Sequence, residues 1–265
     1  MRIALGIEYD GTRFFGWQIQ NGTRTVQASV EEALSKVADH IVKAQCAGRT
    51  DTGVHACNQI VHIDSRAVRD MRSWIFGTNS NLPKDISVLW AKEVGGDFDA
   101  RFSAIGRTYR YVILNRTVRP GLLDSKVAWE CRPLNEQRML EAASHLVGEH
   151  DFTSYRSQAC QAKNPVRTVR RLDICRRGDL IAVDIEANAF LHHMVRNIVG
   201  VLMAIGLDKQ NPSWVKDVLV ARDRTVGGVT APPEGLYLME VRYPEQFNIP
   251  RAVINSGWPE LSPLR

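Results

Sequence analysis

Apolar and polar residues alternate at the start of the chain, where every second position from Ile3 to Tyr9 is apolar. This period of two predicts an amphipathic β-strand that ends at Asp10-Gly11. The spacing then changes to that of an amphipathic helix over 26–37, and Thr25 stands where a capping residue is expected. The pattern therefore predicts a strand followed by a helix that packs on it.

The same two patterns recur along the rest of the chain. Strands are predicted over 59–63 and 86–92, with helical spacing over 69–76 between them, so the first half has the order of an α/β sandwich. The loop over 47–56 is expected at a strand end. In the second half we predict a strand over 107–114, a helix capped by Asn135 with Gly148 just past its end, a hairpin of 168–175 and 180–187, a helix that starts at Asn211-Pro212, and a strand over 236–243.

The strand–helix plan repeats in the second half, which predicts two related domains. We expect an N-terminal α/β domain over 1–106, a C-terminal α/β domain over 107–247 and an irregular tail over 248–265.

The stretch from Phe190 to Ile205 is apolar almost all round, which predicts a buried helix. Its polar residues are His192, His193, Arg196 and Asn197, which fall on adjoining positions at i, i+4 spacing. For the histidines we favour satisfied polar groups at a helix edge over metal ligands. A buried arginine is costly unless it is paired, so Arg196 is expected to have an acidic or phosphate partner.

Positive charge is concentrated in two segments of a chain whose formal net charge is +5. Residues 101–119 hold five arginines and no acidic residue, and 156–177 hold six arginines and Lys163 against Asp173 alone. Arginine suits phosphate recognition, so this distribution indicates a nucleic-acid partner. A solvated basic face is the plainer alternative.

The chain has 265 residues and 44% hydrophobic residues, enough for a substantial core. Its five cysteines form no C-x-x-C pair, which argues against a disulfide framework or a zinc site and favours reduced thiols in the cytoplasm. The N-terminus does not have the pattern of a signal peptide. The most apolar stretch, 198–207, is too short to span a bilayer, so no membrane association is expected.

The loop AGRTDTGVHA (47–56) concentrates chemistry in ten residues. Glycines at 48 and 53 flank Asp51 and allow a sharp turn or the close approach of another molecule. One interpretation is a surface turn in which Asp51 bonds its own backbone. The other is an active-site loop, in which Asp51 acts as nucleophile or base and Arg49 keeps it ionised.

Four segments together resemble the TruA family of tRNA pseudouridine synthases, in the family's order and spacing. They are AGRTDTGVHA (47–56), DARFSAIGRTYRY (99–111), NAFLHHMVRNIVG (188–200) and APPEGLYL (231–238). The resemblance covers roughly residues 2–245. It implies isomerisation of uridine to pseudouridine at positions 38–40 in the anticodon arm of tRNA. It also implies two α/β domains whose mainly antiparallel sheets join, helices packed outside, a basic cleft between them, and a homodimer.

The resemblance also implies roles for single residues. Asp51 is similar to the family's catalytic aspartate, and Arg49 to the arginine that helps to hold the target nucleotide out of the helix. Tyr109 resembles the tyrosine that stacks on the target base, Arg196 the arginine that pairs with the carboxylate, and Leu236 an apolar residue of the pocket. The other substrate-binding candidates are His55, Arg101 and Arg107.

No cofactor or metal is expected, because the isomerisation needs neither redox chemistry nor hydrolysis. The sequence has no G-x-G-x-x-G or P-loop motif and no zinc-deaminase signature. Two rival classes remain, an RNA-binding module without chemistry and another base-modifying enzyme such as a methyltransferase. Whether Asp51 attacks C1′, adds to the base ring or removes a sugar proton stays open.

Overall fold

The computed structural model describes residues 1–251, which form two compact units. Within the described residues, one unit comprises Met1–Gly106 together with 237–251, and the other comprises Arg107–Leu236. The sequence analysis assigns the strand over 236–243 to the C-terminal domain. From Tyr237 that strand instead belongs to the first unit, because it pairs with a strand there.

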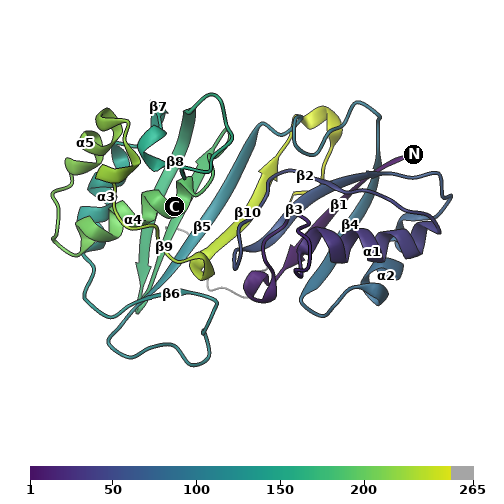
Figure 1. The fold of residues 1–265 in the computed structure, drawn as a ribbon, viewed down its shortest axis with the longest axis horizontal. Coiled ribbons are helices and arrows are strands. Elements are labelled where there is room, and N and C mark those ends of the chain that lie inside the picture. Colours follow the sequence, from purple (N-terminus) through teal and green to yellow (C-terminus); the bar gives the residue numbers. More distant parts are fainter. Residues whose placement is uncertain (252–265) are drawn as a thin grey trace. The chain divides into compact units, whose positions relative to one another are not determined.

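The strands of the first unit are β1 (Arg2–Tyr9), β2 (Gln45–Cys46), β3 (His55–Asp64), β4 (Ile86–Val94) and β10 (Leu236–Arg242). Four of them lie in the order β4, β1, β3, β10 (Figure 1). β1 pairs antiparallel with β3 and β4, and β2 pairs antiparallel with β3. β10 runs parallel to β3, with Tyr237 opposite His55. The predicted opening strand is confirmed, but it is buried on both faces rather than amphipathic.

Two helices accompany these strands, α1 (Val26–Ala38) and α2 (Met71–Asn81). Thr25 occupies the N-cap position of α1, as predicted, although its side chain makes no capping hydrogen bond. The side chain of Asp70 does cap α2, where it accepts a hydrogen bond from the Ser73 amide at 2.6 Å. α1 packs on α2, and α2 packs on β4 (Figure 1).

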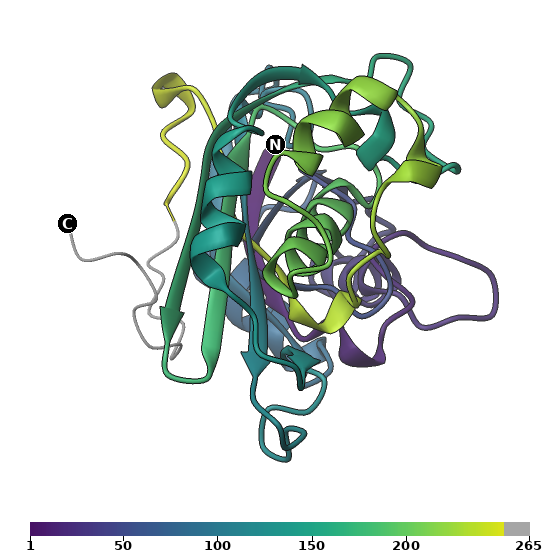
Figure 2. The ribbon, with the colours of Figure 1, turned by 90° about the vertical axis from the view of Figure 1, so that its left-hand side faces the viewer.

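The strands of the second unit are β5 (Gly106–Asn115), β6 (Ala128–Glu130), β7 (Gly148–Asp151), β8 (Val166–Arg177) and β9 (Leu180–Ala187). They lie in the order β5, β9, β8, β7, all antiparallel, and β6 adds a short parallel pairing to β5. The predicted hairpin of β8 and β9 is confirmed, and its long green strands run side by side in Figure 2.

The helices of the second unit are α3 (Glu136–Ser144), α4 (Met194–Gly206) and α5 (Trp214–Ala221). The predicted cap of α3 is confirmed, since the Asn135 side chain accepts from the amides of Gln137 and Arg138. α4 packs on α3 and is buried along most of its length, as its apolar pattern predicted. Short 3₁₀ helices lie at η1 (Gly11–Arg13), η2 (Thr153–Tyr155), η3 (Arg224–Val226), η4 (Pro233–Gly235) and η5 (Glu245–Phe247).

Three predicted helix boundaries in the second unit are wrong. α4 begins at Met194 rather than Phe190, because His193 has a left-handed backbone, with φ 62°, that no α-helix can contain. His192 and His193 therefore precede the helix and have no i, i+4 relation within it. Gly148 begins β7 rather than ending α3, and α5 begins at Trp214 rather than at Asn211-Pro212.

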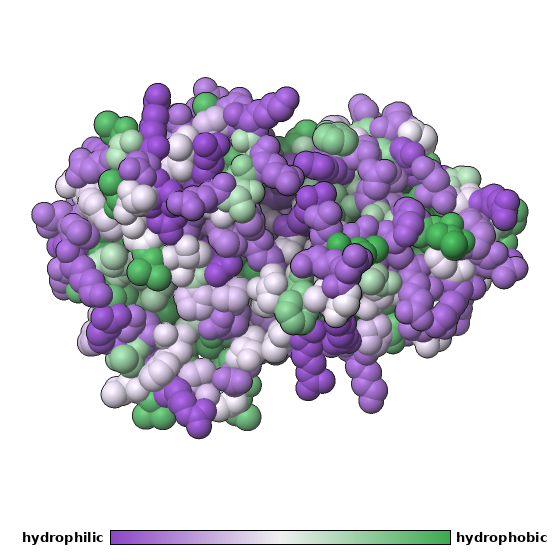
Figure 3. Space-filling model, viewed as in Figure 1, coloured by the Kyte–Doolittle hydropathy of each residue, from purple (hydrophilic) through white to green (hydrophobic). Residues whose placement is uncertain are grey.

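The mixed α/β class with mostly antiparallel strand pairing is confirmed. None of the helices within residues 1–251 is both long and apolar enough to cross a membrane. On the face drawn in Figure 3, apolar residues lie singly or in small groups among hydrophilic ones. Most of the predicted tail, 252–265, lies outside the described residues.

Candidate active site

The motif AGRTDTGVHA forms the connection between β2 and β3 in the first unit. β3 begins at His55, earlier than the predicted position 59, so the last two residues of the motif are strand residues. The Val54 amide donates to the Asp51 carbonyl at 3.1 Å, and Gly53 adopts φ 78°. The predicted sharp turn is therefore present directly after Asp51, and Asp51 itself is half-buried.

The base of this loop is fixed to β3. The Ala47 amide donates to the Ile60 carbonyl at 2.8 Å. The buried side chain of Gln59 accepts from the Gly48 amide at 3.3 Å and donates to the Gly48 carbonyl. Arg49, the next residue, is exposed. The guanidinium of Arg49 thus extends into solvent from a backbone that the strand holds in place.

The charges of Arg49 and Arg101 both act on Cys46 in the first unit. Burial raises the pKa of the Cys46 thiol to about 12, and the charges of Arg49 and Arg101 both act to lower it. Both guanidiniums therefore lie within electrostatic reach of the same thiol. Arg101 is exposed, and its guanidinium carbon lies 5.2 Å from the centre of the Phe102 ring. The two candidates come from separate motifs, and both act on the electrostatic environment of Cys46.

His55 is the first residue of β3 and only 2% exposed. Its Nδ1 lies 3.0 Å from the Gly11 amide nitrogen, which donates to it, and 3.2 Å from Oδ1 of Asp10. The ring stacks on Tyr237 with centroids 4.6 Å apart, and burial raises the pKa of the Tyr237 hydroxyl. These contacts favour a role for His55 in holding the loop.

Tyr109 and Arg107 lie on β5, within the second unit. The Tyr109 ring is 8% exposed and meets the Phe190 ring edge-on, with centroids 5.0 Å apart. An Arg107 Nη donates to the Asn188 carbonyl at 3.0 Å. Both contacts join β5 to the first residues of the segment NAFLHHMVRNIVG. β5 therefore helps to hold the part of the chain that leads into α4.

Arg196 is the third residue of α4 and half-buried. Its Nε donates to the Ala231 carbonyl at 2.8 Å, and the Ala231 amide donates back to the Arg196 carbonyl at 3.1 Å. Leu236, at the start of β10, is 5% exposed. Arg196 thus joins the third and fourth motifs, NAFLHHMVRNIVG and APPEGLYL, within the second unit.

Asn197 is a structural residue that the sequence analysis names among the polar residues of this helix without giving it a role. It is 2% exposed, and its Nδ2 donates to the Tyr155 carbonyl at 2.8 Å. Its Oδ1 accepts from Arg224 at 3.0 Å and from the Thr230 hydroxyl at 2.7 Å. The signal in the sequence is an amide side chain next to Arg196 within a helix whose other residues are apolar or glycine.

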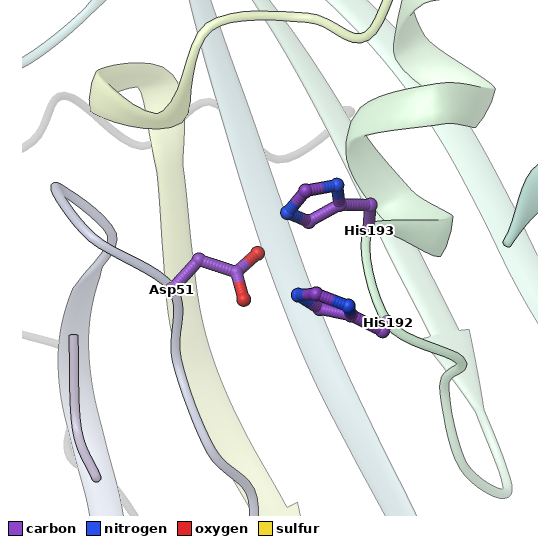
Figure 4. A group of neighbouring side chains, drawn as sticks. All are labelled: Asp51, His192 and His193. Carbon is purple, nitrogen blue, oxygen red and sulfur yellow. The ribbon is translucent and has the colours of Figure 1, made fainter. Parts of the chain in front are cut away.

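The side chains offer the groups that chemistry on RNA requires. Figure 4 shows Asp51 on the loop that leads into β3, and His192 and His193 on the segment that leads into α4. The two imidazole rings lie 4.1 Å apart, centroid to centroid. A carboxylate can act as nucleophile or base, and arginines suit phosphates. A mixed α/β fold that carries a half-buried carboxylate on a glycine turn, with arginines nearby, is typical of an enzyme that acts on nucleic acid.

Comparison with known proteins defines the family. The family model described as tRNA pseudouridine synthase matches residues 6–103 and 142–244. The chain is 58% identical over 251 residues to tRNA pseudouridine synthase A of Nitrosococcus oceani, covering 95% of this chain and 97% of that one. It is 57% identical over 258 residues to the protein of the same name from Alcanivorax borkumensis, covering 97% of each. The chain therefore belongs to the tRNA pseudouridine synthase family, a family of isomerases.

Proposed function

We propose that this enzyme isomerises uridine to pseudouridine at positions 38–40 in the anticodon arm of tRNA, with Asp51 as the catalytic carboxylate. The observation that carries the proposal is the position of Asp51. It is half-buried at a glycine turn between two paired strands, in the centre of a motif that resembles the family's catalytic loop. The names of the relatives support tRNA as the substrate.

The reaction breaks the bond between C1′ and N1 and forms one between C1′ and C5. The proton displaced from C5 is balanced by the proton gained at N1, so no oxidant, reductant or water is consumed. A carboxylate meets this demand either as a covalent nucleophile or as a base that removes a sugar proton. In both routes Asp51 must be ionised when the uridine arrives.

The remaining candidates hold the substrate in this proposal. Arg49 and Arg101 bind phosphates, which suits two exposed guanidiniums on one part of the first unit. Tyr109 stacks on the base after it has been flipped out of the stem, with Leu236 as an apolar wall. Arg196 serves as counter-ion of Asp51, and its Nε bond to Ala231 fixes the plane of the guanidinium for that purpose.

Arg107 and His55 take supporting parts, since both bond backbone groups of their own unit. We also propose that the enzyme is a homodimer and works in the cytoplasm without a cofactor. The resemblance supports the dimer. The cysteines within residues 1–251 form no disulfide, which supports a reducing compartment.

The test is incubation of the purified enzyme with unmodified tRNA in buffer without any cofactor, followed by mapping of pseudouridine along the tRNA. We expect pseudouridine at positions 38–40 and nowhere else. Binding of tRNA without any product would contradict the proposal and support a binding module. A product that forms only after a methyl donor is added would support a methyltransferase.

A further inference from the structure

The chain from Tyr9 to Trp17 runs alongside the Asp51 loop, although the four motifs of the resemblance do not include it. The Trp17 amide donates to the Thr50 carbonyl at 2.9 Å. The Gly53 amide donates to the Phe14 carbonyl at 3.4 Å. The two backbone hydrogen bonds lie on either side of Asp51. We call residues 9–17 the clasp segment.

Side chains extend this hold beyond the two backbone bonds. The hydroxyl of Tyr9 lies 2.7 Å from that of Thr50, and both residues are buried. The Gly11 amide donates to Nδ1 of His55, where the loop enters β3. The clasp segment therefore contacts the loop before, after and beside Asp51.

The clasp segment is itself firmly anchored. Its side chains Phe14 and Trp17 are 1% and 2% exposed. The carbonyls of Gly16 and Trp17 accept hydrogen bonds from the first two residues of α1, Val26 and Gln27, at 3.2 and 2.9 Å. The loop is thus connected through the clasp segment to the end of a packed helix.

Two glycines let the clasp segment come this close. Gly16 has φ 80°, and a Cβ at that position would lie 2.7 Å from the Thr50 carbonyl oxygen and 3.1 Å from the Asp51 carbonyl carbon. At Gly11 a Cβ would overlap the Val54 carbonyl. In both places the obstacle is backbone of the loop, so a side chain could be accommodated only if the loop moved.

We propose that the clasp segment positions Asp51, so that its carboxylate is already in the productive place when the uridine arrives. This inference rests on the proposed catalytic role of Asp51. Gly16 and Tyr9 are positioning residues, because they contact the loop and not the reacting atoms. A displacement of the loop by about 1 Å would be enough to slow the reaction by about 100-fold while tRNA binding persists.

The test compares Gly16→Ala with Gly22→Ala. Both glycines have a left-handed backbone, with φ 80° and 72°, so both variants carry a similar conformational cost. A Cβ at Gly22 would have nothing within 4 Å. We expect Gly16→Ala to lower the single-turnover rate at saturating tRNA by about 10- to 100-fold, with tRNA affinity within about threefold of wild type. Gly22→Ala should keep the wild-type rate within about twofold.

A wild-type rate in Gly16→Ala, or an equal loss in Gly22→Ala, would overturn the inference. If Gly16→Ala fails to fold by circular dichroism, Tyr9→Phe decides, because it removes only the hydroxyl that meets Thr50. We expect Tyr9→Phe to slow single turnover by about threefold or more at unchanged affinity, and an unchanged rate would overturn the inference.

Wild type and Asp51→Asn are measured in parallel to separate two kinds of failure. No pseudouridine from wild type, or undiminished product from Asp51→Asn, contradicts the proposed function itself. If both behave as proposed and the clasp variants keep the wild-type rate, only the positioning role is wrong.

Discussion

The two segments that carry the candidate acid and the candidate arginine are held in different ways. In the first unit, backbone hydrogen bonds from Trp17 and to Phe14 hold the Asp51 loop on either side of Asp51, and side chains of Gln59 and Tyr9 add to them. In the second unit, the first turn of α4 is held by side chains, through Arg196 Nε and both polar atoms of Asn197.

The difference determines which substitutions each region tolerates. A backbone-held loop depends little on the side chains around it, except where a glycine permits close approach. A region held by side chains loses a hydrogen bond with each truncation and leaves a buried partner unsatisfied. We therefore expect the first region to respond mainly in rate and the second mainly in stability.

The largest expected effect concerns Cys46, directly before the Asp51 loop. Because burial raises its pKa to about 12, the thiol stays protonated at pH 8, and only the thiolate reacts with iodoacetamide. Labelling of native Cys46 should be on the order of a thousandfold slower than that of an ordinary thiol, and should rise about tenfold per pH unit.

Peptide mass spectrometry of labelled protein measures this, with exposed Cys131 in the second unit as the internal reference. Equal labelling of Cys46 and Cys131 in the native protein would show that the base of the loop opens freely.

The next effect is on stability, in the region held by side chains. Asn197→Leu removes the partner of the Tyr155 carbonyl and one of the partners of Arg224 and of the Thr230 hydroxyl, which also bond each other. The free energy of unfolding should fall by about 3 kcal/mol, since each buried polar group left unsatisfied costs about 1–3 kcal/mol. Urea denaturation measures the change.

Thr230→Val is the matched control, because it removes one hydroxyl and keeps the bond between Arg224 and Asn197. It should cost only about 1 kcal/mol. Equal losses from both variants would mean that Asn197 is not the centre of this network.

A smaller effect on stability is expected at the Asp51 loop, from the hydroxyl pair of Tyr9 and Thr50. Tyr9→Phe and Thr50→Val should each lower the free energy of unfolding by about 1 kcal/mol, because each breaks the same hydroxyl pair. The double variant should lose hardly more than either single one, which gives a coupling of about 1 kcal/mol. Additive losses would show that the two hydroxyls do not stabilise each other.

The smallest effect concerns tRNA binding by Arg101. If its exposed guanidinium contacts a phosphate, Arg101→Gln should weaken binding a few-fold. It should also reduce the slope of log affinity against log salt by about 0.7–0.9. Filter binding over a salt series measures both quantities. Lys36→Gln, which changes an exposed side chain on α1, is the control, and an equal change in that variant would argue against a specific contact.

The elements with long periodic patterns could be predicted from the sequence. β1, α1, the hairpin of β8 and β9, and the buried character of α4 follow from apolar spacing alone. The start of α4 could not be predicted, because it depends on the left-handed backbone of His193. Histidine adopts this conformation only in a particular tertiary setting. Short strands such as β6 and β7 have too few residues for a period to be visible.

The site could be predicted in part. The sequence placed Arg49 and Asp51 on a turn next to a strand, because glycines and a lack of apolar residues mark that loop. It did not reveal the contact of Gly16 with Thr50, since two segments of a chain meet there only after folding. The one available signal for this contact was Gly16 itself, which stands among Phe14, Phe15 and Trp17.

The most direct test of the account is single-turnover pseudouridine formation by Asp51→Asn at saturating tRNA. Asp217→Asn, which changes an exposed carboxylate on α5, serves as the matched control, and circular dichroism checks that both variants fold. We predict that Asp51→Asn loses activity by about 10³-fold or more, since removing a catalytic nucleophile has effects of at least that size. Binding of tRNA should be kept or improved, because a negative charge is removed beside phosphates. A folded Asp51→Asn enzyme with the wild-type rate would contradict the account.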